Sequence, residues 1–283
     1  MKVNRDIFWY KGKMVISGYV IEIYSYEKGV YLKRRNNGRA GNGFTSDEEK
    51  EKNRQVVLMR ARRDLRRIVN ANFGQWGNDV TCKFVTLTFR ENVTDIDAAN
   101  YEFKKFVKRL NYAVYGKKCS GLKYTVVLEF QERGAVHYHV IFYNLPYTKA
   151  DVLGDVWGNG FIKVNKIDEI DNVGAYVCKY LTKGNNDDRL RGRKCYFNSR
   201  GLKKPIEKYF DCDEMESAKK SLPAERMTFR CEFENEYTGK IIYEQYNISE
   251  NNCKKEMRSN GKNHVERTGE KSGRFSVAVE LAR

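Results

Sequence analysis

The sequence contains little proline and little histidine, with three residues of each among 283. The scarcity of proline, together with 19 tyrosines and 15 phenylalanines, argues against a disordered chain and for ordered α/β or α+β structure. Hydrophobic residues make up 41% of the chain, which is enough to build a real core. The length is that of one or two domains.

The cysteines are odd in number, seven in all, and no two of them have the C-x-x-C spacing. This argues against a zinc ribbon and against a redox pair. No apolar run approaches the length that spans a membrane, and the first residues, MKVNRDIFWYKGK, lack the uninterrupted apolar core of a secretory signal. We therefore expect a cytoplasmic protein without a membrane partner.

Acidic residues are outnumbered, with 37 Asp and Glu against 53 Lys and Arg, a net charge of +16 and a pI of about 9.4. Such an excess favours a polyanionic partner, usually nucleic acid, over a merely soluble basic protein. Part of the charge falls on a helix expected over residues 46–70, which Ser46 would cap. Its candidate phosphate contacts are Arg62, Arg63, Arg66 and Arg67, although a solvated helix face explains them equally well.

Hydrophobic patterning predicts an α+β fold. Residues 4–33 alternate as strands do, and a regular series follows, with strands over 84–89, 124–131, 136–143 and 161–164 and helices over 96–110, 148–156 and 168–183. This order implies a central antiparallel sheet with helices on one face, a split βαβ arrangement. The expected divisions are N-terminal strands and a loop (1–45), a central domain (46–210), a C-terminal hairpin extension (211–250) and a flexible basic tail (251–283).

Two of the three histidines, His137 and His139, lie two residues apart in the apolar strand GAVHYHVIFYN. The two-residue period of a strand places both imidazoles on one face. Two hydrogen-bonded core histidines are the alternative, but two adjacent polar rings are costly to bury. The pair therefore favours metal binding.

The preceding strand offers a third ligand. If Glu132, Arg133 and Gly134 form a three-residue hairpin turn, Glu129 lies directly opposite His137 on the same face, and Gln131 points the same way nearer the turn. Either side chain can then be the third ligand. Two imidazoles and one carboxylate, with positions left open, suit Mg²⁺ or Mn²⁺ acting on a phosphate.

The helix over 168–183 repeats a Tyr-x-x-Lys unit, first from Tyr176 to Lys179 and then from Tyr180 to Lys183. Helical geometry brings both tyrosine hydroxyls to one edge of the helix beside its apolar stripe, with Tyr176 the more exposed. Lysine cations and a bound metal both favour the phenolate form of a tyrosine. Ordinary core packing explains tyrosines at this spacing equally well.

Three segments taken together resemble a known superfamily. VTLTF (85–89), the triplet His137-Tyr138-His139 and the segment Tyr176-Val-Cys-Lys179-Tyr180 are similar, in order, to the motifs of His-hydrophobe-His rolling-circle replication initiators. The doubled Tyr-x-x-Lys is most similar to the two-tyrosine initiators of bacteriophages and plasmids. The resemblance covers roughly residues 54–205.

The resemblance implies a metal-dependent endonuclease that nicks and joins single-stranded origin DNA through a 5′-phosphotyrosine. It assigns His137, His139 and, less firmly, Glu129 to the metal, Tyr176 to the nucleophile, and Tyr180 and Lys179 to supporting roles. Lys183 joins the candidate DNA contacts. The sequence holds no G-x-x-x-x-G-K-[ST] motif, so we expect a host helicase to unwind the DNA and a host polymerase to extend it.

Two alternatives remain open. In the first, the protein is a non-catalytic single-stranded nucleic-acid-binding domain that uses its charge and aromatics such as Phe84 and Tyr138, and its histidines are structural. In the second, the same chemistry serves a relaxase or a single-strand transposase. The sequence does not decide between these roles.

Overall fold

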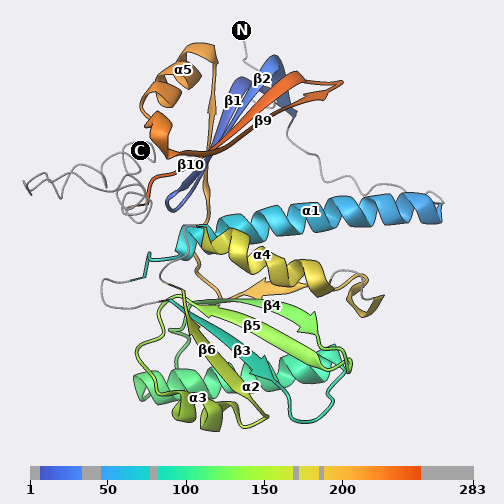
Figure 1. Ribbon diagram of the computed structural model, residues 1–283, viewed down its shortest axis with the longest axis vertical. Coiled ribbons are helices and arrows are strands. Elements are labelled where there is room, and N and C mark those ends of the chain that lie inside the picture. The colour runs from blue at the N-terminus through green and yellow to red at the C-terminus, as the bar shows by residue number, and fades with distance from the viewer. Residues whose placement is uncertain (1–6, 34–45, 77–81, 168–171, 185–187, 250–283) are drawn as a thin grey trace, which may run out of the picture. The chain divides into compact units, whose positions relative to one another are not determined.

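The computed structural model describes residues 7–33, 46–76, 82–167, 172–184 and 188–249 (Figure 1). Its contacts divide the chain into two compact units, one formed by Met1–Asn53 together with Pro205–Arg283 and the other by Arg54–Lys204. Within the described ranges, no helix is both long enough and apolar enough to cross a membrane.

The unit Arg54–Lys204 is built on a five-stranded antiparallel sheet in the order β6-β3-β5-β4-β7. Its central strand β5 is almost wholly buried because apolar residues point to both faces, as its sequence VHYHVIF requires. The strands are β3 (Lys83–Thr88), β4 (Tyr124–Phe130), β5 (Val136–Phe142), β6 (Ile162–Lys166) and β7 (Tyr196–Asn198).

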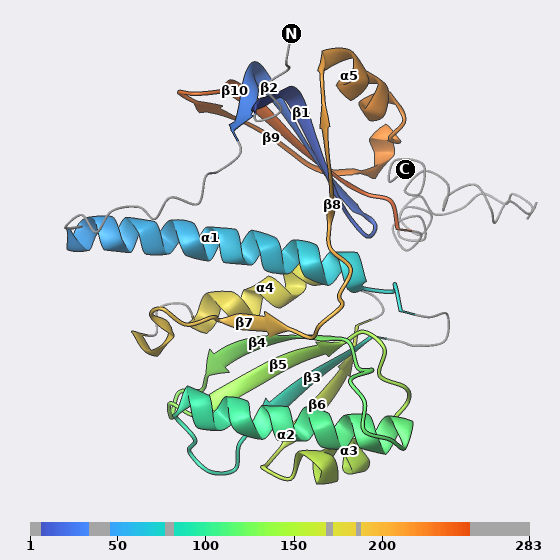
Figure 2. The same ribbon diagram turned by 180° about the vertical axis from the view of Figure 1, so that it is seen from behind.

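Helices cover both faces of this sheet (Figures 1 and 2). On one face lie α2 (Ile96–Tyr115) and α3 (Ala150–Trp157), and Tyr138 of β5 points toward them and donates to Asn100 Oδ1 over 2.8 Å. On the other face lies α4 (Val173–Gly184), with the C-terminal half of α1 (Asp47–Asn72) beside it. His137 and His139 alternate with Tyr138 and therefore belong to the α4 face.

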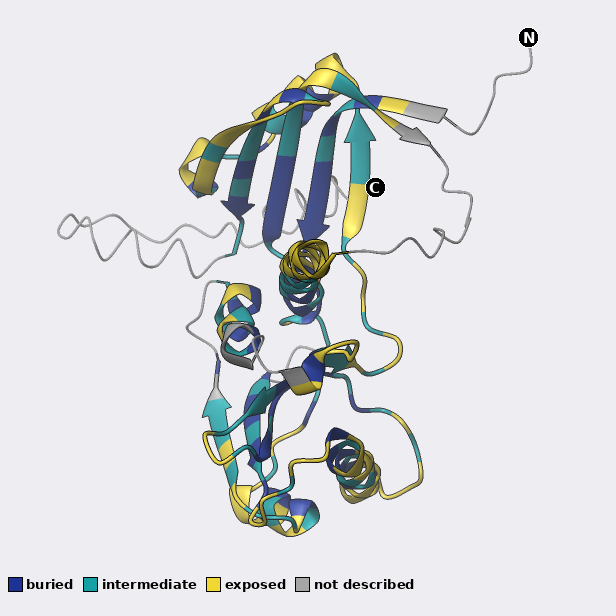
Figure 3. Ribbon diagram, turned by 90° about the vertical axis from the view of Figure 1, so that its right-hand side faces the viewer, coloured by how far each residue is buried: buried dark blue, intermediate teal, exposed yellow. Residues whose placement is uncertain are grey.

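The second unit contains another antiparallel sheet, in the order β8-β1-β2-β10-β9. Helix α5 (Cys212–Lys220) packs on it through Met215 and Ala218, against a small core that includes Met14, Ile21 and Ile23. Figure 3 shows buried and half-buried residues along the inner strands of this sheet. The strands are β1 (Ile7–Ser17), β2 (Val20–Lys33), β8 (Ile206–Phe210), β9 (Met227–Asn235) and β10 (Gly239–Asn247), and two short 3-10 turns lie at Asp188–Leu190 and Ala224–Arg226.

The α+β class and the central antiparallel sheet are confirmed. The expectation that helices pack on one face holds for α2 and α3, whereas α4 lies on the opposite face because its own stripe Val173, Val177 and Leu181 is buried there. The terminal segments were expected to form separate extensions, but their strands β2 and β10 pair in one sheet. The tail over 251–283 lies outside the described residues.

Candidate active site

The hairpin β4–β5 brings the candidate metal ligands together. Residues 132–134 form its three-residue turn, which Gly134 closes with a φ of +86° and a bond from its N–H to Gln131 O. The register places Glu129 directly opposite His137, as the sequence predicts. The turn therefore fixes which carboxylate meets the histidine pair.

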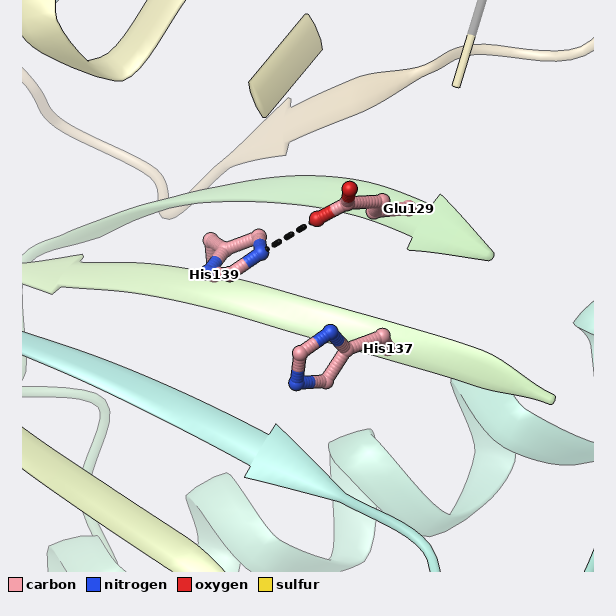
Figure 4. Close-up of side chains that lie close together, drawn as sticks. All are labelled: Glu129, His137 and His139. Atoms are coloured by element: carbon pink, nitrogen blue, oxygen red, sulfur yellow. Dashed lines mark hydrogen bonds and ion pairs between the residues drawn. The ribbon is translucent and has the colours of Figure 1, made fainter. Parts of the chain in front are cut away.

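Glu129, His137 and His139 offer ligand atoms that all lie within 4.8 Å of one another (Figure 4). Glu129 Oε2 is 2.6 Å from Nε2 of His139, which is 5% exposed. Burial, with His139 beside it, lowers the pKa of His137 to about 4 despite the opposing effect of Glu129, so that His137 is neutral near neutral pH. A neutral imidazole presents the lone pair that a metal needs.

This donor set fits a divalent metal ion. Two imidazoles and one carboxylate are the only His, Cys, Asp or Glu side chains that cluster here among the described residues, which leaves coordination positions open for a substrate. Gln131 is placed less well as the third ligand, because its Oε1 accepts from Nε of Arg133 over 3.2 Å. The structure therefore favours Glu129.

Thr86 completes the surroundings of the site and was missed in the sequence. It lies directly opposite His139 in the β3–β5 register, and its Oγ1 is 3.2 Å from His139 Nδ1. If Nδ1–H donates to Thr86, the lone pair of Nε2 is left on the side of Glu129. The signal was the alternation of VTLTF, which puts Thr86 on the histidine face once the strands pair.

Replacement of Thr86 by Val is therefore expected to weaken Mn²⁺ binding by about 10–100-fold, because the ring of His139 loses the partner that fixes its tautomer. Calorimetric titration with Mn²⁺ measures this. Thr86→Ser keeps the hydroxyl and should bind as the native protein does. Thr88→Val makes the same change on the same strand face without a bond to His139. Equal losses in the Thr86→Val and Thr88→Val variants would exclude this role for Thr86.

Helix α4 is held in place at its N-terminal end by α1. Asn70 of α1 accepts from Gly174 N–H over 2.8 Å and donates to Asn172 Oδ1 over 3.0 Å. A Cβ atom on Gly174 would lie 2.3 Å from Arg66 O, so that only glycine permits this close approach. This crossing positions the tyrosines that follow on α4.

Gly174→Ala should consequently destabilise the protein by about 1–3 kcal/mol, because the added methyl group pushes α4 away from α1. Thermal and urea unfolding measure the change. Gly154→Ala is the matched control, since Gly154 is also in a helix and a Cβ there meets nothing within 4 Å. A stability loss no larger than that of the control would show that the close approach to Arg66 O is relieved at little cost.

The two tyrosines of α4 face the histidine side of the sheet together. Their hydroxyl oxygens are 3.0 Å apart, and the Tyr180 ring lies 4.0 Å from the His139 ring, measured between centroids. Phe84 packs against both tyrosines, at 5.8 Å from Tyr176 and 5.2 Å from Tyr180. Burial raises the pKa of Tyr180, and the bond with Tyr176 and the charge of Glu129 raise it further.

The basic residues expected near the site have different environments. Lys179 is exposed, with its Nζ 5.7 Å from the centre of the Tyr176 ring, and nothing is described for the side chain of Lys183. Of the four arginines proposed as phosphate contacts, Arg63 is exposed and pairs with Asp64, while Arg62 and Arg66 are half-buried. Arg67 is a correction, because it is only 6% exposed in the buried last turns of α1 and does not offer its guanidinium to a phosphate there.

Comparison with known proteins gives one family. Residues 82–185 match the model of a family of replication-associated proteins, described under the name ORF2, over a little more than a third of the chain. The matched span runs from β3 to α4 and holds Glu129, both histidines of the site and both tyrosines. No curated protein and no solved structure matches. The family match supports a replication-associated protein with a role in the initiation of replication.

Proposed function

We propose that the protein is a metal-dependent endonuclease that nicks single-stranded origin DNA to start rolling-circle replication, in a phage or plasmid replicon. One observation carries the proposal: a cluster of two histidines and one glutamate lies beneath a helix whose two tyrosine hydroxyls are 3.0 Å apart, one of those rings packing on His139. The donors and the nucleophiles of such a reaction thus come from opposite sides of one space.

When bound, Mg²⁺ or Mn²⁺ would act as a Lewis acid toward the scissile phosphate, held by Glu129, His137 and His139. The hydroxyl oxygen of Tyr176 attacks the phosphorus, the bond from phosphorus to the 3′ oxygen breaks, and a 5′-phosphotyrosine forms. The proton that tyrosine loses is balanced by the one that the leaving 3′ oxygen gains. The covalent bond keeps the energy of the phosphodiester, so that rejoining needs no ATP.

Tyr176 is the better placed for the first attack. Lys179 lies beside its ring, and a nearby cation favours the phenolate. Tyr180 is less readily ionised, because its pKa is raised by burial and by Glu129. We assign Tyr180 to the second transfer, which releases the finished strand. A host polymerase would extend the freed 3′-hydroxyl, and a host helicase would open the duplex.

The direct test is incubation of the protein with labelled single-stranded origin DNA and Mn²⁺, followed by denaturing electrophoresis. We expect a cleaved product and an adduct of protein and DNA that survives denaturation, both abolished by a chelator. Cleavage without an adduct would contradict the tyrosine chemistry. DNA binding without cleavage would instead favour a non-catalytic binding protein, and joining without an origin preference would favour a transposase.

A further inference from the structure

A group of arginines borders the candidate active site at one end of the sheet. The segment 189–194 reads RLRGRK, with four cations and no acid among six residues. Arg189, Arg191 and Arg193 are all exposed, as is Arg133 in the β4–β5 turn. These four residues are called the arginine rim below. None of them was predicted from the sequence as a DNA contact.

The segment is anchored so that its cations point outward. Leu190 and Cys195, at its two ends, are 8% and 9% exposed and belong to the hydrophobic core. Between them Gly192 turns the chain with a φ of +70°, and Arg193 N–H donates to Leu190 O. The apolar residues thus hold a short loop whose remaining side chains are basic and exposed.

Hydrogen bonds and ring stacking tie the rim to the strands that carry the metal ligands. Cys195 O accepts from Leu128 N–H over 3.0 Å, one residue before Glu129. Arg189 stacks its guanidinium 3.6 Å from the centre of the Phe130 ring and donates to Gly134 O over 2.7 Å. The rim therefore lies against the hairpin that holds Glu129 and His137.

Arg133 adds a charge on the same turn. Its guanidinium donates to Gln131 Oε1 and to the main-chain oxygens of Phe89 and Arg90. All three acceptors are neutral, so that these bonds fix its position without cancelling its charge. Arg193 contributes less, because it pairs with Asp97 over 2.8 Å.

The charge of the whole chain points to the same place. Residues 54–204 contain 28 Lys and Arg against 15 Asp and Glu, so that they hold most of the net charge of +16. A polyanion should therefore bind the unit that holds the site. Arginine suits phosphate in particular, since its planar fork donates two parallel hydrogen bonds.

We infer that the arginine rim binds the backbone phosphates of the single-stranded DNA next to the scissile phosphate, and so guides the strand across Glu129 and His137. This inference rests on the proposed function for the position of the cut, but not for the binding of the strand. The occupant is a phosphodiester backbone, which the rim recognises without reading bases.

The test is salt-dependent binding of a fluorescent single-stranded oligonucleotide to the full chain. The variant Arg133→Gln/Arg189→Gln/Arg191→Gln should bind about 10–100-fold more weakly near 0.1 M salt. The slope of log Kd against log salt should fall by about 0.7 for each phosphate that is no longer bound, or by about 2 in all. The control Lys104→Gln/Lys108→Gln/Lys117→Gln removes the same charge from α2 and the residues after it, on the side of the sheet away from the histidines.

The outcomes are distinguishable. Equal losses in the two triple variants would overturn the rim, because only total charge would then matter. If the rim variant melts at a much lower temperature, Arg191→Gln alone and Arg189→Lys replace it. Arg191→Gln should lower the slope by about 0.7, and Arg189→Lys should weaken binding while keeping the charge. An unchanged affinity and slope in both would contradict the inference.

Activity separates the rim from the proposed function. The rim variant should bind Mn²⁺ as the native chain does and nick at an unchanged rate once DNA is saturating, with only the DNA concentration at half-maximal rate increased. A native chain that binds DNA through the rim but never nicks would refute the endonuclease and leave the rim intact. Loss of Mn²⁺ binding in the rim variant would show instead that these arginines serve the metal site.

Discussion

His137→Ala and His139→Ala are each expected to abolish nicking, with a loss of at least about 10³-fold in rate, while single-stranded DNA still binds within a few-fold of the native affinity. Each substitution removes one of three ligands that lie within 4.8 Å of one another, and two remaining ligands hold a divalent ion poorly. The DNA contacts come from other residues and should survive. The rate of adduct formation in Mn²⁺ measures the effect.

The third histidine of the chain, His264, provides the matched control, because His264→Ala removes the same ring more than a hundred residues away in the sequence. A readout other than activity comes from thermal melting. Saturating Mn²⁺ should stabilise the native chain by about 2.7 kcal/mol at a hundred times its Kd, and should leave the two site variants unchanged. Full nicking by either variant in a metal-replete buffer would remove the histidines from the mechanism.

The same assay decides between the two candidates for the third ligand. Glu129→Gln should lose most of the Mn²⁺ affinity, since it replaces the carboxylate that lies 2.6 Å from His139 by a neutral amide. Gln131→Ala should lose little, because the Gln131 oxygen is bound to Arg133. The reverse result would assign the ligand to Gln131.

The site was predictable from the sequence where its geometry is local. His137 and His139 share a face through the two-residue period of one strand, and Glu129 meets them through a turn of three residues. Tyr176 and Tyr180 share an edge through the four-residue spacing of one helix. None of these relations depends on how distant segments fold together.

Relations between distant segments were not predictable in the same way. Ser25 pairs with Ile242 although more than 200 residues separate them, and no short pattern in either strand names its partner. Strand β8 and helix α5 were missed because one is short and half-exposed and the other is largely polar. Arg67 was misread because a run of arginines suggests a solvated face, whereas burial at the end of α1 follows from packing.

The division of labour between the tyrosines has the most direct consequence for the reaction. Tyr176→Phe keeps the ring that packs against Phe84 and removes only the hydroxyl. We expect it to eliminate the first covalent adduct. Tyr180→Phe should still nick once, with Tyr176 attacking, but should join poorly, because no second nucleophile then remains for the transfer that releases the strand.

The hydroxyl bond between the tyrosines makes the double variant necessary. Since the two oxygens are 3.0 Å apart, a small rotation of either ring brings its oxygen to the position of the other, and Tyr180 can replace Tyr176 at a reduced rate. Residual adduct in Tyr176→Phe would therefore have to vanish in Tyr176→Phe/Tyr180→Phe. Tyr196→Phe is the control, as a half-buried tyrosine of the same unit outside the pair.

Mass spectrometry of the adduct peptide assigns the attached residue, and it separates three results. Attachment to Tyr176 in the native chain and to Tyr180 only in Tyr176→Phe supports the proposed order. Attachment to Tyr180 from the start reverses it, and would mean that the ring packed on His139 is the better nucleophile despite its raised pKa. Cleavage by the double variant would place the nucleophile elsewhere, because that variant has neither of the two tyrosine hydroxyls that α4 presents to the metal ligands.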